Sequence, residues 1–220
     1  ERAQSPAQAA AAMDQAKSAL LRAERVLAQL LVLARVDAMQ SAGAVQAIDI
    51  AQDKTLSSSL EETVNAFKLV GSAKPDLLAN KEALAEVTKE AILLSKASGD
   101  TLESSVNSLT GTLNQFNLGA EESRRVIDVL AAGSKAGAVA IPELSAGLEK
   151  FGAVAKANNV SVEQAIALQE TLGDKQISGA EAGTQLRNII LKLANAGKGY
   201  VNGQFDINAA LEQTKKEFES

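Results

Sequence analysis

Acidic side chains are the residues of this chain whose types and spacing come closest to those of a catalytic site. Two carboxylates can divide the roles of general acid and general base, and neighbouring pairs occur at Glu61/Glu62 and Glu121/Glu122, with Glu181 further along. Nearly all of them fall in the expected first turn of a helix, where negative charge is stabilised by free N–H groups and by the helix dipole. We therefore assign these carboxylates to helix starts and not to catalysis.

The other candidate motifs are incomplete. The chain has no His and no Cys, which removes the commonest general base and metal ligand as well as thiolate metal sites. Asp206 and Asn208 beside Asn202-Gly203 resemble part of a calcium loop, but the bidentate Glu is missing. Gly197-Lys198-Gly199 lacks the spacing of a phosphate-binding loop. We expect no enzyme activity, no catalytic, metal-binding or cofactor-binding residues, and no cofactor.

The charge, the low aromatic content and the hydropathy of the chain argue against two further classes of function, nucleic-acid binding and membrane insertion. The net charge is −5 and aromatic residues make up 3% of the chain, so we expect no nucleic-acid binding. Arg124-Arg125 is interpreted as a solvated pair on a helix face, with a partner contact as the alternative. The most apolar stretch, Val26 to Val36, is too short for a transmembrane segment, because only nine residues separate Arg25 from Arg35. The chain begins without Met, and we expect it to be a fragment of a longer protein.

The elements that carry these residues are short helices with clear boundaries. Apolar residues recur every three or four positions, and the fold class predicted is all-α, a multi-helix bundle of short capped helices preceded by long helices over residues 7–50. Helix starts are indicated by capping boxes at Ser58–Glu61, Asp100–Glu103, Ser161–Gln164 and Ser178–Glu181. Helix breaks are expected near Gly71, Gly99, Gly119, Gly133, Asn159 and Lys175. Asn202-Gly203 predicts a small β-hairpin over residues 200–205, after which Asp206 caps a final helix.

A pseudo-repeat appears at an offset of 42 residues. Leu102, Val106, Leu109 and Leu113 correspond to Leu144, Leu148, Phe151 and Ala155, and Leu118 corresponds to Val160. Each unit is a longer helix, a tight turn containing Asn, and a shorter helix. Helix hairpins of this size occur both in compact bundles and in superhelical stacks. Two copies are too few to indicate an extended array, so we expect a compact bundle, with a short superhelical stack as the alternative.

Gly183 is an unusual residue for a helix interior. Glycine there costs about 1 kcal/mol relative to alanine, so we expect a compensating gain in packing. Ala182, Gly183 and Leu186 would let another helix approach closely. That helix belongs either to the same chain or to a second copy in an oligomer.

Three segments carry a resemblance to a known family. Ile177–Leu193, Gly152–Ala165 and Arg125–Gly133 resemble the core region of phage tail tape-measure proteins of the TP901 type. The resemblance covers roughly residues 80–197. On this basis we expect three regions: an N-terminal helical region with long, coiled-coil-like helices (1–76), a tape-measure-like helical core (77–197), and a hairpin or loop with the start of a further helix (198–220).

The resemblance implies a structural virion protein of a phage or prophage. Such a protein sets tail length and assists tail assembly and genome delivery, and lies in the lumen of the tail tube after assembly in the host cytoplasm. The partners implied are the tail-tube protein, tail-assembly chaperones and tail-tip or baseplate proteins, with a homo-oligomer as a further alternative. A different class of function is also open: a helical adaptor or scaffold, in a secretion system or another assembly, that binds partner helices.

Overall fold

The computed structural model describes residues 43–137 and 139–219. The elements are α2 (Gly43–Gln52), α3 (Leu60–Ala73), the 3-10 helix η1 (Pro75–Ala79), α4 (Lys81–Ser98), α5 (Leu102–Phe116), the 3-10 helix η2 (Ala120–Glu122), α6 (Ser123–Ala136), α7 (Ile141–Ala157), α8 (Val162–Gly173), α9 (Gly179–Asn195), β1 (Tyr200–Val201), β2 (Gln204–Phe205) and α10 (Ile207–Glu219). The expected all-α bundle of short capped helices is thus confirmed. Most of the long N-terminal helices expected over residues 7–50, and the apolar stretch Val26–Val36, lie outside the described residues. No helix in the described ranges combines the length and the apolar character that a membrane crossing requires.

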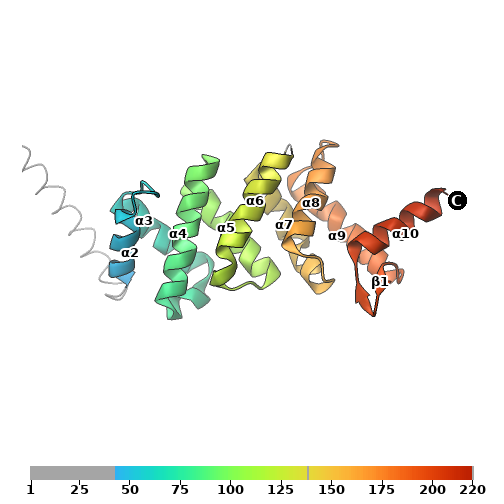
Figure 1. The fold of residues 1–220 in the computed structure, drawn as a ribbon, viewed down its shortest axis with the longest axis horizontal. Helices are drawn as coiled ribbons and strands as arrows, with labels where there is room; N and C mark the ends of the chain where they lie inside the picture. Colours follow the sequence, from blue (N-terminus) through green and yellow to red (C-terminus); the bar gives the residue numbers. More distant parts are fainter. Residues whose placement is uncertain (1–42, 138, 220) are drawn as a thin grey trace, which may run out of the picture.

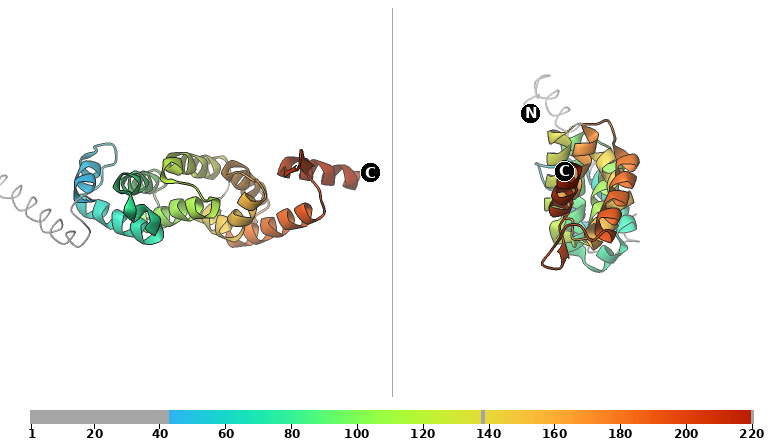
Figure 2. Two further views of the ribbon diagram at one scale, coloured as in Figure 1. Left: turned by 90° about the horizontal axis from the view of Figure 1, so that it is seen from below. Right: turned by 90° about the vertical axis from the view of Figure 1, so that its right-hand side faces the viewer.

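The helices form two layers along one long axis. In Figure 1, α4, α6 and α8 stand side by side in one layer, and Figure 2 shows α3, α5, α7 and α9 in the second layer behind them. The main contacts join each helix to its neighbour in sequence and to the next helix of its own layer, as between α5 and α7 or between α6 and α8. The bundle is therefore elongated and has the helix order of a superhelical stack, in place of the compact arrangement expected from the sequence.

The 42-residue pseudo-repeat has a matching backbone geometry. Asn117 and Asn159 occupy equivalent positions and have left-handed φ angles of 50° and 55°. In each unit the same bond closes the helix end, from Leu118 N to the Leu113 carbonyl at 2.8 Å and from Val160 N to the Ala155 carbonyl at 2.9 Å. Such a bond, made across a residue with positive φ, ends a helix in a tight turn, and asparagine tolerates this conformation better than most residues.

Helix starts follow the predicted capping chemistry, with shifts of one residue. Ser161 and Gln164 form the expected reciprocal capping box of α8. In α3 and α5 the caps are Ser59 and Thr101, one residue later than predicted, because their side chains reach the third residue of each helix. Ser178 precedes α9 without a cap bond from its side chain, and its hydroxyl instead bonds to Glu143 of α7 at 3.2 Å.

Two of the predicted helix breaks lie two and three residues beyond the glycines that were expected to make them. Helix α3 continues past Gly71 to Ala73, and α6 continues past Gly133 to Ala136. Each glycine makes room for a neighbour: a Cβ atom would lie 2.8 Å from Leu78 Cδ2 at Gly71 and 2.4 Å from Ile166 Cγ2 at Gly133. These glycines therefore serve helix packing and not helix termination.

The other breaks lie close to where they were expected. Gly99 ends α4 with a left-handed φ of 74°, and α5 ends three residues before Gly119 because Asn117 makes the turn. Helix α8 ends two residues before Lys175. The hairpin is confirmed, with Tyr200 opposite Phe205 and Val201 opposite Gln204, and α10 follows it.

Candidate functional site

The predicted close-packing residues lie where α9 crosses α7. Ala182, Gly183 and Leu186 are buried on the side of α9 that meets α7. A Cβ atom on Gly183 would lie 2.3 Å from the carbonyl oxygen of Gly147 and 2.8 Å from its Cα. Backbone therefore meets backbone at this crossing, and glycine is needed because no side chain fits between the two helices.

A third helix completes this crossing. Gln169 of α8 is 1% exposed, and its Nε2 donates a hydrogen bond to the Leu144 carbonyl of α7 at 3.1 Å. A Cβ on Gly147 would lie 1.8 Å from the Gln169 Oε1 atom, so Gly147 is enclosed by Gly183 on one side and by this amide on the other. Sequence analysis missed both residues, although Gly147 carries the same signal as Gly183, a glycine inside a helix.

The acidic residues considered for catalysis do not converge. Glu61 and Glu181 stand in the first turns of α3 and α9, and Glu121 lies in η2. Glu62 pairs with Lys96 of α4 at 2.7 Å. Among the residues that the structure describes, no group of three or more acidic side chains could hold a metal ion. These carboxylates serve helix starts and ion pairs between helices.

The polar residues of the C-terminal segment also have structural contacts. Asp206 Oδ1 accepts bonds from the backbone N–H groups of Asn208 at 2.9 Å and Ala209 at 3.2 Å, which makes Asp206 the cap of α10 as predicted. Lys198 pairs with Glu217 of the same helix. Asp206 thus serves the start of α10, and Lys198 joins this helix to the segment that precedes the hairpin.

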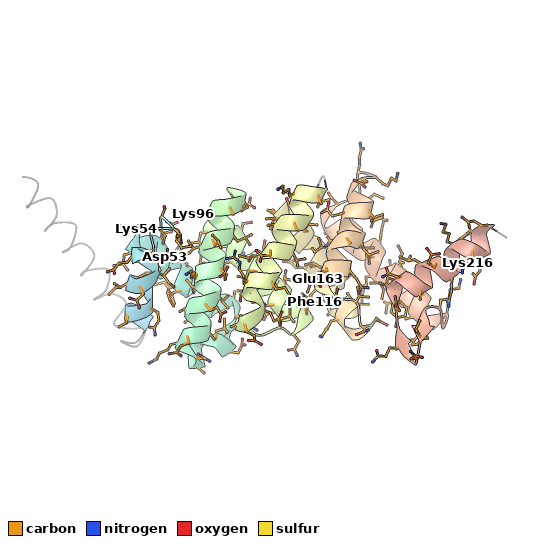
Figure 3. All side chains as sticks on the ribbon, in the orientation of Figure 1. Asp53, Lys54, Lys96, Phe116, Glu163 and Lys216 are labelled. Carbon is orange, nitrogen blue, oxygen red and sulfur yellow. The ribbon has the colours of Figure 1, made fainter. Side chains whose placement is uncertain are left out.

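The adjacent arginines of α6 extend to opposite neighbours within one layer. Arg124 approaches Glu90 of α4, with Nη1 3.6 Å from Oε2, and burial raises the pKa of that carboxyl while Arg124 opposes the shift. Arg125 pairs with Glu122 at 2.5 Å and with Glu163 at the start of α8 (Figure 3). Hydrogen bonds to Glu122 and then Glu163 raise the pKa of Arg125. The two arginines thus join α6 to its two neighbours in the layer, α4 and α8. The charge pattern of the sequence alone did not predict these contacts.

Glu170 of α8 lies over the C-terminal end of α6. Both of its carboxylate oxygens are buried and have no hydrogen-bond partner within the described ranges. A Cβ on Gly137 would come within 1.3 Å of Oε2, so the carboxyl fills the space that this glycine leaves. Burial, and secondarily Asp174, raise the pKa of Glu170.

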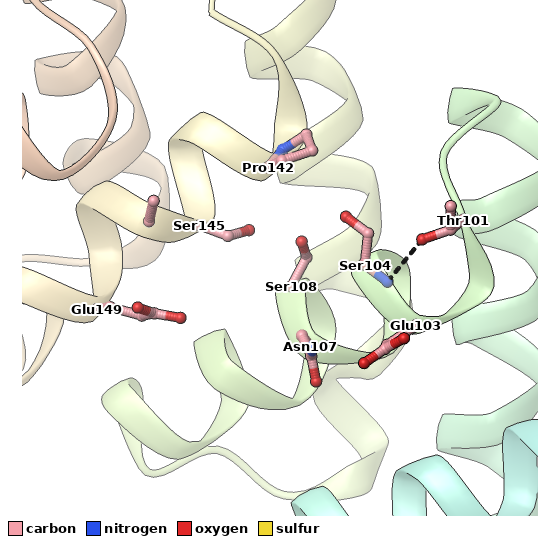
Figure 4. A pocket seen from close by; sticks show the side chains of 9 residues that line it. Thr101, Glu103, Ser104, Asn107, Ser108, Pro142, Ser145 and Glu149 are labelled. Carbon is pink, nitrogen blue, oxygen red and sulfur yellow. Dashed lines mark hydrogen bonds between the residues drawn. The ribbon is translucent and has the colours of Figure 1, made fainter.

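A polar groove opens between the N-terminal halves of α5 and α7 (Figure 4). Its volume is about 350 Å³. Most of the residues that line it carry a hydroxyl, amide or carboxylate group, among them Ser104, Ser108 and Asn107 from α5 and Ser145 and Glu149 from α7. Further toward their C-terminal ends the same helices close together, because a Cβ on Gly152 would lie 2.9 Å from Gln115 Cβ.

One family of known proteins accounts for most of the chain. The family model described as phage-related minor tail protein matches residues 46–219. The chain belongs to this family. No curated protein and no solved structure matches it.

Membership of the minor tail protein family fixes the general role of the chain. It is a structural protein of a phage tail, associated with the virion and in contact with other tail components. The matched range covers all the helices from α3 to α10 and most of α2. The glycine crossing and the polar groove are therefore features of the tail-protein region itself.

Proposed function

We propose that this minor tail protein is part of the tape-measure protein of a phage or prophage tail. In this role it contributes to setting tail length, assists tail assembly and takes part in genome delivery. It lies in the lumen of the tail tube in the virion and in the host cytoplasm during assembly. Its partners are the tail-tube protein, the tail-assembly chaperones and the tail-tip or baseplate proteins.

The family match over residues 46–219 is the observation that carries this proposal. It includes the whole of residues 80–197, where the sequence resembles the tape-measure core. The elongated two-layer form supports the proposal as well, because an arrangement that extends along one axis suits the interior of a tube (Figure 2).

Within the tape-measure protein, we assign residues 80–197 to a folded module and not to the extended ruler. As one continuous helix these 118 residues would span about 177 Å at 1.5 Å per residue. The chain instead breaks at Gly99, Asn117 and Asn159. Repeated turns of this kind shorten a segment and would serve no purpose in a ruler.

An in-frame deletion of residues 80–197 in the phage tests this proposal. We expect loss of tail assembly or infectivity, and in any tails that form a shortening far below 177 Å, measured by electron microscopy. A phage that carries only Gly111→Ala in this segment is the matched control and should keep the parental tail length. Viable virions with tails shorter by the full helical length would show that the segment belongs to the ruler. Normal tails and normal infectivity after the deletion would contradict the tape-measure proposal itself.

A further inference from the structure

The groove between α5 and α7 holds polar groups that the fold leaves without partners. Ser108 is 3% exposed, and its hydroxyl makes no hydrogen bond within the described part of the chain. Ser145 Oγ on the facing helix is buried and equally unpartnered. A buried hydroxyl such as that of Ser145 normally has a partner, and in Figure 4 Ser108, Ser145 and Ser104 turn toward the space between the helices. The groove is therefore lined with hydrogen-bonding groups that face an open volume.

Two unpaired carboxylates flank these hydroxyls. Glu103 of α5 and Glu149 of α7 line the groove, and neither makes an ion pair or side-chain hydrogen bond with another described residue. Some acidic residues elsewhere in the stack, such as Glu62 and Glu163, pair with a basic residue of another helix. None of the residues that line the groove is basic. The groove thus gathers negative charge and hydrogen-bond acceptors without a counter-charge of its own.

We propose that this groove binds an arginine side chain presented by a partner protein. A guanidinium group carries five N–H donors in a planar fork and accepts no hydrogen bonds, which complements carboxylates that only accept and hydroxyls that can accept. Arginine also pairs with carboxylates in a bidentate geometry that lysine cannot reproduce. The volume of about 350 Å³ accommodates such a side chain together with part of its backbone. This binding does not depend on the tape-measure assignment.

Titration of the chain of residues 1–220 with a peptide probe tests the proposal. The probe is the acetylated and amidated peptide Gly-Arg-Gly-Arg-Gly, and its control contains citrulline in place of arginine, which preserves the shape and removes the charge. NMR spectra are expected to show that the backbone amides of residues 101–108 and 142–149 shift with the arginine peptide. The citrulline peptide should bind at least tenfold more weakly. Equal binding of both peptides, or shifts scattered over the whole surface, would overturn the proposal.

Variants locate the site and separate it from general charge attraction. Glu103→Gln with Glu149→Gln should weaken binding at least tenfold, and Ser108→Ala should weaken it about threefold. The matched control, Glu61→Gln with Glu82→Gln, removes the same charge from the first turns of α3 and α4 and should stay within twofold of the parent chain. Since all four glutamates are exposed, circular dichroism should show unchanged helix content.

Small cations provide the last comparison. Spermidine carries several amine donors but no planar guanidinium and no peptide backbone. We expect it to displace the peptide only at concentrations far above those of the peptide itself. Displacement at equal concentration would assign the groove to free polyamines and would overturn the assignment to a protein partner.

Discussion

Replacing Gly183 by leucine tests whether the crossing of α7 and α9 holds the stack together. A Cβ at this position would lie 2.3 Å from the Gly147 carbonyl oxygen, whereas ordinary contacts begin at 3.4 Å. The clash is with backbone, which cannot rotate away, so α9 must move by about 1 Å. Overpacking of this kind costs about 1–3 kcal/mol. We expect the free energy of unfolding, measured by urea titration of the helical circular dichroism, to fall by that amount.

Replacing two helix glycines by alanine, one at a time, separates the effect of packing on stability from the effect of helix propensity. Alanine is favoured over glycine inside a helix by about 1 kcal/mol. At Gly111 of α5 a Cβ would meet nothing within 4 Å, so Gly111→Ala should gain up to that amount. Gly183→Ala should fail to gain it, because the strain against Gly147 offsets the propensity. The reasoning is refuted if both alanine variants gain equally, or if Gly183→Leu unfolds at the parental urea midpoint.

Three further predictions concern charged side chains. Hydrogen bonds from Thr55, followed by Lys89, lower the pKa of Asp53 from 3.8 to about 2. Its stabilising effect should therefore be lost progressively as the pH falls from 3.8 through about 2, and Thr55→Val should raise the titration midpoint seen by NMR. The raised pKa of Glu170 means that stability falls as the pH rises from about 4.5 through the folded-state value. Glu170→Gln should thus stabilise the protein at pH 7 but not at pH 4 in urea titrations, and an equal effect at both pH values would contradict this. Arg125→Gln should cost at most about 1 kcal/mol, because its ion pairs are exposed, and the cost should shrink in 1 M NaCl; a cost that does not change with salt would argue against the ion pairs.

Local chemistry explains which parts of the fold the sequence predicts. Asn159 and Gly99 end helices because their left-handed backbone angles suit these residue types, and the Ser161–Gln164 capping box marks a helix start through bonds within four residues. The same reasoning assigned Gly71 and Gly133 to helix ends, but both lie inside their helices, two and three residues before the ends. Their reason for being glycine lies in Leu78 and Ile166, residues that only the folded chain brings close.

The candidate sites also divide into features that depend on local sequence and features that depend on residues of other helices. Gly183 could be singled out because glycine inside a helix is unfavourable in any sequence. Its partner Gly147 and the amide of Gln169 come from other helices, and nothing in the chain order pairs them. The groove was not predicted because it forms between two helices. In the sequence, a serine such as Ser108 is an ordinary helix residue, and only the folded chain places α7 opposite it.

The linear order of the described helices in the two-layer stack has a consequence for its evolution. The main contacts of each helix are with helices one or two places away in the chain, so neither end must meet the other. A barrel or a closed ring admits only certain numbers of elements, but a row of hairpins can gain or lose a unit by duplication or deletion while the remaining units keep their neighbours. Gene rearrangements in steps of one hairpin could therefore change the size of this region without requiring a new fold.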